Sequence, residues 1–337
     1  MFKLKEIVEQ FSYLIPKKTS SFEEVFISGI STPDLPVENT LILIKSTKFF
    51  DNLIKLSPSS KFEKLLLVVP TALESELNLE KFSYLVSEKS IDQVMVDISK
   101  MFYELFEENT QCLLDGRQIG NTKIDPSAQI AQGVFIGENV EVGADSVIMP
   151  GTVIMPGSII GKHVKVFPRV TIYPKTIIRD EVTIHSGSII GSDGFGYNQL
   201  DGEHKKVFHL GNVIIEENVE IGANCTIDRG TFGPTIIGRG SKLDNLVHLA
   251  HNCILDENVI VCGQSGLAGS VRVGKFSMLS GHVGVAPGVE IGEKAQVGGH
   301  SAVTGNLEGG QVYSGYPARP LKEWLRSQAT LRKLAKK

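Results

Sequence analysis

The sequence predicts a mainly β protein built around a parallel β-helix of hexapeptide repeats. Between positions 124 and 303 an aliphatic residue recurs every sixth position, with one long and one four-residue interruption. A period of six fits neither the 3.6 residues of a helical turn nor the two-residue alternation of an isolated strand. It is typical of a solenoid in which each hexad is a strand plus a corner and three hexads close a coil. The first unbroken run is Ile124, Ile130, Ile136, Val142, Ile148, Ile154, Ile160, Val166, Ile172, Ile178, Ile184 and Ile190.

Two further features of the hexad support this fold. Glycine often directly follows the aliphatic residue, as at Gly137, Gly143 and Gly161, which predicts a tight corner at that position. Small residues often lie four places after the aliphatic, where we expect them to fill the inside of a corner. Cys225 and Cys253 fall on this position, and they are therefore predicted to be core thiols.

The hexad divides the chain into three predicted parts. The N-terminal part lacks the period and mixes helical stretches (2–14 and 91–108) with short apolar strands (41–44 and 65–69), which indicates a small α/β domain. Two prolines, Pro317 and Pro320, end the coils because proline cannot donate to a strand ladder. The predicted parts are residues 1–115 (α/β domain), 116–318 (β-helix) and 319–337 (basic amphipathic helix).

Composition bounds the function. The chain has 337 residues, is 42% hydrophobic and carries a formal net charge of −4, so we expect no nucleic-acid partner. No apolar run approaches the length of a membrane span, so we expect a cytoplasmic protein with no secretory leader and no membrane span. The four cysteines lack metal-site spacing, and no metal or cofactor is expected.

Departures from the period mark candidate functional segments, because a residue present only for stacking should obey it. The first departure is a loop over residues 191–211, which is too long for a corner. The second is the four extra residues within 228–234. The densest polar cluster follows at 244–253 and contains His248 and His251.

Periodicity gives His251 a specific environment. It lies two places after Leu249, so its side chain should leave the core near a corner. Asp244, at the preceding corner, would hold the imidazole in one tautomer and raise its basicity, as a general base requires. Gly269 lies eighteen residues after His251, and its backbone N–H would stabilise an oxyanion in the same cleft.

Several segments resemble one enzyme family. The sequence is similar to the UDP-3-O-(3-hydroxyacyl)glucosamine N-acyltransferases of lipid A synthesis over almost the whole β-helix, with the same domain order. The family's hexapeptide coils are left-handed, so the resemblance implies a left-handed parallel β-helix. The segments that carry it are Gly194-Phe195-Gly196-Tyr197, Ile221-Gly222-Ala223-Asn224-Cys225-Thr226-Ile227-Asp228-Arg229-Gly230, Asp244-Asn245 and Ala250-His251-Asn252.

The resemblance implies a homotrimer with active sites between neighbouring prisms. The acyl donor would be acyl carrier protein, whose phosphopantetheine carries the chain, and the acceptor the 2-amine of a UDP-acylglucosamine. His251 matches the family's general base, Asp244 its partner and Gly269 its oxyanion N–H. Phe195, Tyr197 and Asn252 would contact substrate.

Two positions depart from the family pattern. The family's second active-site histidine corresponds to Gly288, while His282 and His300 lie nearby and are eighteen residues apart. His282 is a candidate replacement and is therefore included among the substrate-binding residues.

The second departure lies in the segment that matches the family's uracil site, Phe-x-x-Asn-x-x-Tyr. Here that stretch has Leu43, Ser46 and Phe49. Phe49 can still stack on a base and Ser46 can still hydrogen-bond, but the first aromatic is missing.

The C-terminal segment carries seven positive charges from Arg319 onward and one negative charge, Glu323. In a trimer this would attract an acidic carrier protein. A solvated helix face, or leucines and Trp324 packing across the trimer, is the alternative interpretation.

Three rival functions stay open at this level. The O-acyltransferase one step earlier in the same pathway shares an Ala-His-Asp/Asn-Cys stretch. A metal-dependent hydratase of the γ-carbonic anhydrase type uses the same prism with three histidines on zinc. A catalytically silent solenoid that only binds a partner is the non-enzyme alternative.

Overall fold

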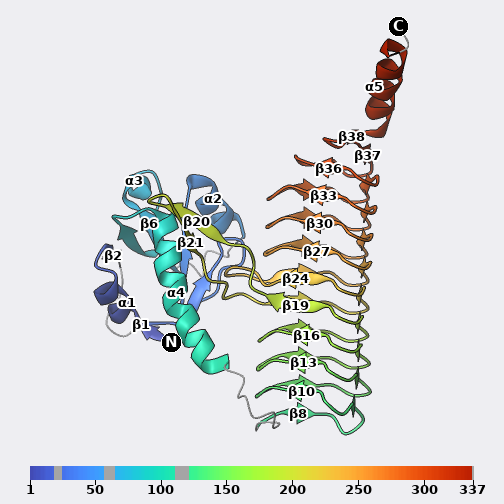
Figure 1. Cartoon of the computed structure of the whole chain (residues 1–337). Helices are drawn as coiled ribbons and strands as arrows, with labels where there is room; N and C mark the ends of the chain where they lie inside the picture. Colours follow the sequence, from blue (N-terminus) through green and yellow to red (C-terminus); the bar gives the residue numbers. More distant parts are fainter. Residues whose placement is uncertain (19–24, 57–64, 111–120, 336–337) are drawn as a thin grey trace. The chain divides into compact units, whose positions relative to one another are not determined.

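The structure is a computed structural model that describes residues 1–18, 25–56, 65–110 and 121–335. The chain forms two compact units (Figure 1). The N-terminal unit comprises Met1–Glu108, Gly196–Leu210 and Thr231–Gly233, and the β-helical unit comprises Asn109–Phe195, Gly211–Gly230 and Pro234–Lys337. The boundary expected near residue 115 lies outside the described residues.

The N-terminal unit is a five-stranded sheet with helices. Its strand order is β2-β7-β6-β5-β4, parallel except for the antiparallel pair β2 and β7. The strands β5 and β6 are continuously apolar, as expected for parallel strands covered on both faces. The elements are β1 (Phe2–Lys3), α1 (Leu4–Gln10), β2 (Leu14–Lys18), β3 (Phe26–Ile27), β4 (Gly29–Ser31), β5 (Thr40–Leu43), α2 (Thr47–Leu56), β6 (Leu66–Pro70), α3 (Thr71–Glu74), β7 (Ser83–Ser87) and α4 (Ile91–Thr110).

Both interruptions of the hexad period pack with this N-terminal unit. The first forms a two-stranded antiparallel hairpin, β20 (Tyr197–Leu200) and β21 (Glu203–Lys206). Beyond it, the Phe208 N–H donates to the Ser99 hydroxyl of α4 at 3.1 Å, and the Phe208 ring lies 4.7 Å from that of Tyr103. The second interruption contributes Phe232 to the unit's apolar core. The two insertions are therefore parts of a domain made from separate segments.

The β-helical unit (Figure 1) consists of three sheets that the chain visits in turn, and they are parallel except for the antiparallel pair β37 and β38 at the end of the second. Sheet 1 contains β8 (Lys123–Ile124), β11 (Glu141–Val142), β14 (Ile159–Ile160), β17 (Ile177–Ile178), β22 (Val213–Ile215), β25 (Thr235–Ile237), β28 (Ile254–Leu255), β31 (Arg272–Val273) and β34 (Glu290–Ile291). Sheet 2 contains β9 (Gln129–Ile130), β12 (Val147–Ile148), β15 (Lys165–Val166), β18 (Thr183–Ile184), β23 (Glu220–Ile221), β26 (Lys242–Leu243), β29 (Ile260–Val261), β32 (Met278–Leu279), β35 (Gln296–Val297), β37 (Val312–Ser314) and β38 (Arg319–Pro320). Sheet 3 contains β10 (Phe135–Ile136), β13 (Val153–Ile154), β16 (Thr171–Ile172), β19 (Ile189–Ser192), β24 (Thr226–Asp228), β27 (His248–Leu249), β30 (Gly266–Leu267), β33 (Gly284–Val285) and β36 (Ala302–Val303).

The predicted stacking is confirmed. The aliphatic residues of the hexads point inward and pair with their equivalents one coil away, as Ile136 pairs with Ile154 and Ile154 with Ile172. The register survives both insertions, because Ile190 pairs with Ile227 and Ile227 with Leu249. The predicted fold class, a mainly β parallel β-helix with an N-terminal α/β part and a C-terminal helix, is confirmed.

Most of the small residues that lie four places after an aliphatic are buried, as predicted, although Ala128 is only partly buried, and some of them also bridge coils. Ser265 is one example: its hydroxyl donates to the Ser280 carbonyl at 3.0 Å and accepts the Val283 N–H at 3.1 Å. Cys225 and Cys253 occupy the same position and are fully buried. Both are core thiols, as the period predicted.

The predicted tight corner at the glycines is confirmed, and its cause is the approach of the next coil. A Cβ added at Gly143 would lie 2.6 Å from the carbonyl oxygen of Gly161, so glycine is needed there because the next coil approaches closely. The left-handed backbone position lies two places further on, where Asn139, Asp145 and His163 have φ values of 56°, 56° and 55°. Asparagine and aspartate tolerate this conformation better than most residues, and the corner does not require glycine for its φ angle.

A C-terminal helix, α5 (Leu321–Leu334), follows the last coil (Figure 1). It begins after Pro320, and none of its described residues is buried. Leu325, Leu331 and Leu334 are exposed, while Trp324 packs against Gly315 of the last coil. Lys336 and Lys337, which belong to the predicted helix, lie outside the described residues. In the part of the chain that the structure describes, no helix combines the length and apolarity needed to cross a membrane.

Candidate active site

An open groove of about 1000 Å³ runs along the outer face of sheet 3. Its lower part is lined by His248 and His251, and its wall rises over three further coils. The outward strand position above His248 is successively Gly266, Gly284 and Ala302. These outward positions therefore add no side chain larger than a methyl group. Most of the remaining lining is apolar, and its polar groups are the two histidines and the hydroxyls of Ser270, Thr304 and Tyr316.

Gly269 lies directly above His251, as the eighteen-residue period predicted. A Cβ added at Gly269 would lie 2.6 Å from both Cε1 and Nε2 of the His251 ring. The coil ladder pairs the N–H groups of Ala268 and Ser270 and leaves the Gly269 N–H without an acceptor among the described residues. An imidazole nitrogen and an unpaired backbone N–H thus meet at one corner of the groove.

Asn252 fixes the orientation of His251. The distance between His251 Nδ1 and the Asn252 side-chain oxygen is 3.1 Å. An amide oxygen only accepts hydrogen bonds, so Nδ1 carries the proton and Nε2 is left as the basic nitrogen. The Asn252 backbone is held in turn, because its N–H donates to the buried Thr235 hydroxyl at 2.9 Å. Asn252, predicted as a substrate contact, is therefore a partner of His251.

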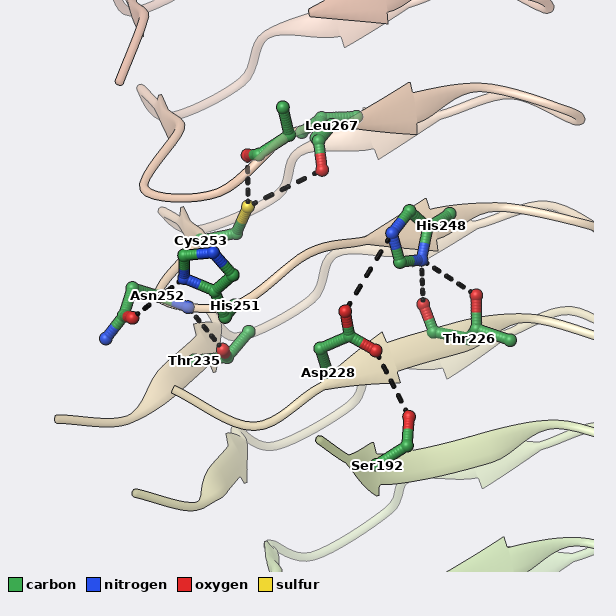
Figure 2. A network of polar contacts seen from close by, with 10 residues as sticks. Ser192, Thr226, Asp228, Thr235, His248, His251, Asn252, Cys253 and Leu267 are labelled. Atoms are coloured by element: carbon green, nitrogen blue, oxygen red, sulfur yellow. Dashed lines mark hydrogen bonds and ion pairs between the residues drawn. The ribbon is translucent and has the colours of Figure 1, made fainter. Parts of the chain in front are cut away.

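A second polar pair lies beside His251 (Figure 2). Asp228 Oδ2 is 3.9 Å from His248 Nε2, and the other carboxylate oxygen accepts the Ser192 hydroxyl at 3.1 Å. The Asp228 side chain is only 10% exposed, whereas that of His248 is 47% exposed. The pair thus combines a buried carboxylate with an imidazole that opens onto the groove.

Burial raises the pKa of the Asp228 carboxyl above its ordinary value. His248, the Ser192 hydroxyl and His251 act in the opposite direction, and Asp193 adds to the rise. Burial likewise raises the pKa of the Cys253 thiol, to about 12. Cys253 is next to the site in the chain, but at neutral pH it is protonated and therefore a poor nucleophile.

Arg229 holds the loop around this pair. It is buried, its Nε donates to the Gly191 carbonyl at 2.7 Å, and its guanidinium lies 5.9 Å from the centre of the Tyr173 ring. Asp193 Oδ1 is 4.0 Å from the same Nε. The arginine next to Asp228 thus ties the start of the first insertion to the coil below it.

Asp244 does not contact His251 within this chain. Consecutive hexads put the two residues on different corners, and Asp244 lines a separate pocket of about 410 Å³ on sheet 2. Its carboxylate accepts the N–H of Asn245 at 2.7 Å and that of Gly263 at 3.0 Å. Both oxygens are therefore engaged with backbone, and the expected contact with the imidazole is not formed in one chain.

His282 also lies away from the groove. It stacks on His300 with ring centres 4.5 Å apart and planes 8° apart, as their eighteen-residue separation suggested. Both stand at the corner between sheets 2 and 3, whereas His251 stands at the corner between sheets 3 and 1. Gly288 does line the groove, and its N–H donates to the Gly269 carbonyl at 2.9 Å. The structure does not bring His282 to the Gly288 position.

The other predicted contacts divide between the two units. Phe195 lines the groove and is 85% exposed, whereas Tyr197 begins β20 in the N-terminal unit. Ser46 and Phe49 lie where β5 leads into α2, and the Phe49 ring is 42% exposed. Leu43 is buried in the core of the N-terminal unit, so it offers no surface for a base.

Sequence reasoning missed the pairing of Asp228 with His248. The signal was present: the four-residue insertion lengthens that coil from eighteen to twenty-two residues, so Thr226 pairs with His248. Counting twenty-two residues for this coil, and not eighteen, would have placed Asp228 next to both histidines. Across the described ranges, no group of three His, Cys, Asp or Glu side chains is placed to hold a metal ion.

The comparisons with known proteins agree with the motifs. A UDP-3-O-acylglucosamine N-acyltransferase from Wolinella succinogenes is 45% identical over 161 residues, covering 48% of this chain and 51% of that protein. One from Helicobacter pylori (strain J99) is 50% identical over 196 residues, covering 56% of each chain. The resemblance to this family is confirmed.

The chain spans about half the length of the curated relatives it matches. No protein-family model matches it. Among solved structures, a UDP-N-acetylglucosamine acyltransferase from Campylobacter jejuni is 26% identical with a TM-score of 0.44, covering 59% of this chain and 73% of that one.

The state of the thiol next to His251 can be tested by alkylation. With a pKa of about 12, Cys253 is almost entirely in the unreactive thiol form at pH 8 and is also fully buried. We expect iodoacetamide to leave Cys253 unmodified in the native protein and to modify it after denaturation, as measured by peptide mass spectrometry. Native labelling of Cys253 at the rate of a free thiol would contradict this assignment.

Proposed function

We propose that the protein is an N-acyltransferase that moves a 3-hydroxyacyl chain from acyl carrier protein to the 2-amine of UDP-3-O-acylglucosamine, in lipid A biosynthesis. The observation that carries this proposal is the corner at which His251 Nε2 lies against Gly269. The names of the relatives supply the substrate class. The geometry supports the reaction class, because it combines a base with a donor for an oxyanion.

The proposed reaction forms one C–N bond and breaks one C–S bond. His251 Nε2 takes a proton from the acceptor nitrogen as that nitrogen attacks the thioester carbon. The carbonyl oxygen gains negative charge and accepts the Gly269 N–H. The tetrahedral intermediate then expels the carrier's thiolate, which takes the proton from His251, leaving an amide and a free thiol. No cofactor is needed beyond the carrier's own phosphopantetheine.

The smooth wall above His248 fits the acyl donor. A Cβ added at Gly266 or Gly284 would meet no atom within 4 Å, so the fold does not require glycine at either position. Small residues there keep the groove open, and Ala302 and Thr304 continue it upward. A mainly apolar groove with small residues at its outward strand positions suits an extended chain of methylene groups, which gains about 0.8 kcal/mol per buried CH₂.

The N-terminal unit supplies a candidate uridine site. Ser46 lies at the carboxyl end of a parallel strand and at the start of α2, the usual place for a ligand in an open α/β sheet. The exposed Phe49 ring in the first turn offers a stacking surface for uracil. Because Leu43 is buried and has no aromatic ring, we propose that Phe49 alone stacks on the uracil.

A homotrimer is supported by an apolar stripe on the outside of sheet 1. Five successive coils carry isoleucine at the outward strand position: Ile159, Ile177, Ile214, Ile236 and Ile254. Charged residues flank the stripe below at Glu141 and above at Arg272. Contact between copies along this face would bury the stripe.

The assembly can be tested by light scattering. We expect the purified protein to have three times the mass of one chain, and Ile177→Lys to lower that mass by placing a charge in the stripe. Glu290→Lys, on the same sheet but outside the stripe, is the matched control. A wild-type protein that stays monomeric at micromolar concentration contradicts the homotrimer.

The basic face of α5 supports acyl carrier protein as the donor. Arg326, Arg332 and Lys333 are exposed on the described part of the helix, and opposite charge accelerates encounter with an acidic partner. We propose a cytoplasmic enzyme, since acyl carrier protein is water-soluble and the acceptor is linked to a water-soluble nucleotide.

The decisive assay uses the purified protein with UDP-3-O-acylglucosamine and hydroxyacyl carrier proteins of graded chain length, and detects the amide by mass spectrometry. His251→Ala should lower kcat/KM by about 10²- to 10⁴-fold, the usual contribution of a general base. His163→Ala, an exposed corner histidine far from the groove in the coil ladder, should retain wild-type activity. Two further reactions test the need for UDP and for the carrier protein. One uses an acylglucosamine acceptor that lacks UDP, and the other uses an acyl donor attached to coenzyme A.

Three outcomes overturn parts of the proposal. Absence of amide with every donor refutes the activity. An ester product on UDP-N-acetylglucosamine would indicate the O-acyltransferase instead. Full activity in His251→Ala would refute the assigned base.

A further inference from the structure

The Asp228–His248 pair has no role in the reaction derived above. Its carboxylate is only 10% exposed, and its imidazole lines the groove beside His251. Figure 2 shows the carboxylate with a histidine on either side. Folding alone does not explain a buried acid here, since burying a carboxylate costs free energy unless something pairs with it.

His248 presents its basic nitrogen to Asp228. Its Nδ1 is 3.2 Å from the Thr226 carbonyl oxygen and 2.8 Å from the Thr226 hydroxyl. A carbonyl oxygen only accepts, so Nδ1 carries the proton and Nε2 has the lone pair. Nε2 and the carboxylate are 3.9 Å apart, too far for a hydrogen bond. A single nitrogen with several N–H groups can reach both at about 2.8 Å.

The acceptor's chemistry gives such a site a use. An alkyl ammonium group with a pKa near 8 is largely protonated at neutral pH. Turning an ammonium into an amide removes two protons from nitrogen, whereas turning a hydroxyl into an ester removes one from oxygen. The departing thiolate accepts only one proton in either case. An acceptor that binds as the ammonium ion therefore has one more proton to lose than His251 and the thiolate can take.

We infer that Asp228 and His248 form an ammonium subsite that selects an amine over a hydroxyl acceptor and takes up the extra proton. This inference rests on the proposed N-acyl transfer. Asp228 holds the ammonium by charge, and His248 Nε2 takes one proton from it, giving a neutral amine and an imidazolium opposite the carboxylate. The amine attacks the thioester, and His251 takes the second proton and delivers it to the thiolate. His248 then releases its proton to solvent through its exposed edge.

Electrostatics favours this assignment. In a poorly solvated site a carboxylate attracts a cation more strongly than in water, and a hydroxyl gains no such charge interaction. The charged and polar groups facing Asp228 are His248, His251, Ser192 and Asp193. Burial raises the pKa of the carboxyl, and the two neighbouring histidines and the Ser192 hydroxyl only partly offset this effect. An arriving ammonium would offset it further.

The first test compares two acceptors that differ at one atom. UDP-3-O-acylglucosamine carries the 2-amine, and UDP-3-O-acylglucose carries a hydroxyl in its place. Asp228→Asn should lower kcat/KM at pH 7 for the amine by about 10²-fold and leave the hydroxyl rate unchanged. His248→Gln should have the same selective effect. Asp256→Asn, an exposed aspartate one place after Leu255 on another corner, is the matched control.

The second test varies pH. As pH rises above about 8, the amine arrives unprotonated and only one proton must leave. The ratio of Asp228→Asn activity to wild-type activity on the amine should therefore rise with pH toward one. A uniform loss on both acceptors, or a ratio that stays low at high pH, would show that Asp228 is only structural.

A binding measurement separates this inference from the proposed function. Without any acyl donor, calorimetry should show that the wild type binds the amine more tightly than the hydroxyl analogue at pH 7, and that Asp228→Asn removes the difference. If wild type makes no amide but keeps this preference, the transfer activity fails and the subsite stands. If wild type makes amide but binds both equally, the subsite fails and the activity stands.

Discussion

Each coil of the β-helix hydrogen-bonds to the coils before and after it, so a residue's height along the prism is set by its place in the chain. Inward aliphatics stack on one another, as Leu249 does on Leu267, and corners stack on corners. The approach is so close that a Cβ at Gly269 would overlap the His251 ring. The site depends on this constraint, because one coil supplies the imidazole and the next supplies the N–H above it. No long-range side-chain packing is needed to bring the two together.

That regularity decides what can be predicted from sequence. The sheets, the core residues and the stacking of Gly269 on His251 follow from counting residues in hexads and in coils of eighteen. Asp244 does not meet His251 within one chain because consecutive hexads put the two residues on different corners, and its carboxylate accepts the backbone N–H groups of Asn245 and Gly263. The Asp228–His248 pair was missed because it depends on an insertion that shifts the count. The packing of Phe232 with the N-terminal unit depends on distant contacts, which periodicity does not encode.

The two histidines of the groove are chemically similar but differently surrounded. Each has its Nδ1 proton held by an oxygen acceptor, the Asn252 amide for His251 and the Thr226 carbonyl for His248. Each thus directs a basic Nε2 toward other groups, an unpaired N–H at Gly269 in one case and the Asp228 carboxylate in the other. Different environments give like groups different roles. In the proposed reaction His248 takes the first proton from the ammonium, and His251 takes the second as the amine attacks the thioester. The buried Cys253 takes no part.

The most direct measurement is a crystal structure of the protein with the bound diacyl product, UDP-2,3-diacylglucosamine. The account predicts that the amide carbonyl oxygen accepts the Gly269 N–H, and that the amide nitrogen lies within hydrogen-bonding reach of His251 Nε2 and near His248. The new acyl chain should run up sheet 3 past Gly266 and Gly284. An amide bound elsewhere, with its nitrogen out of reach of both histidines, would contradict the account.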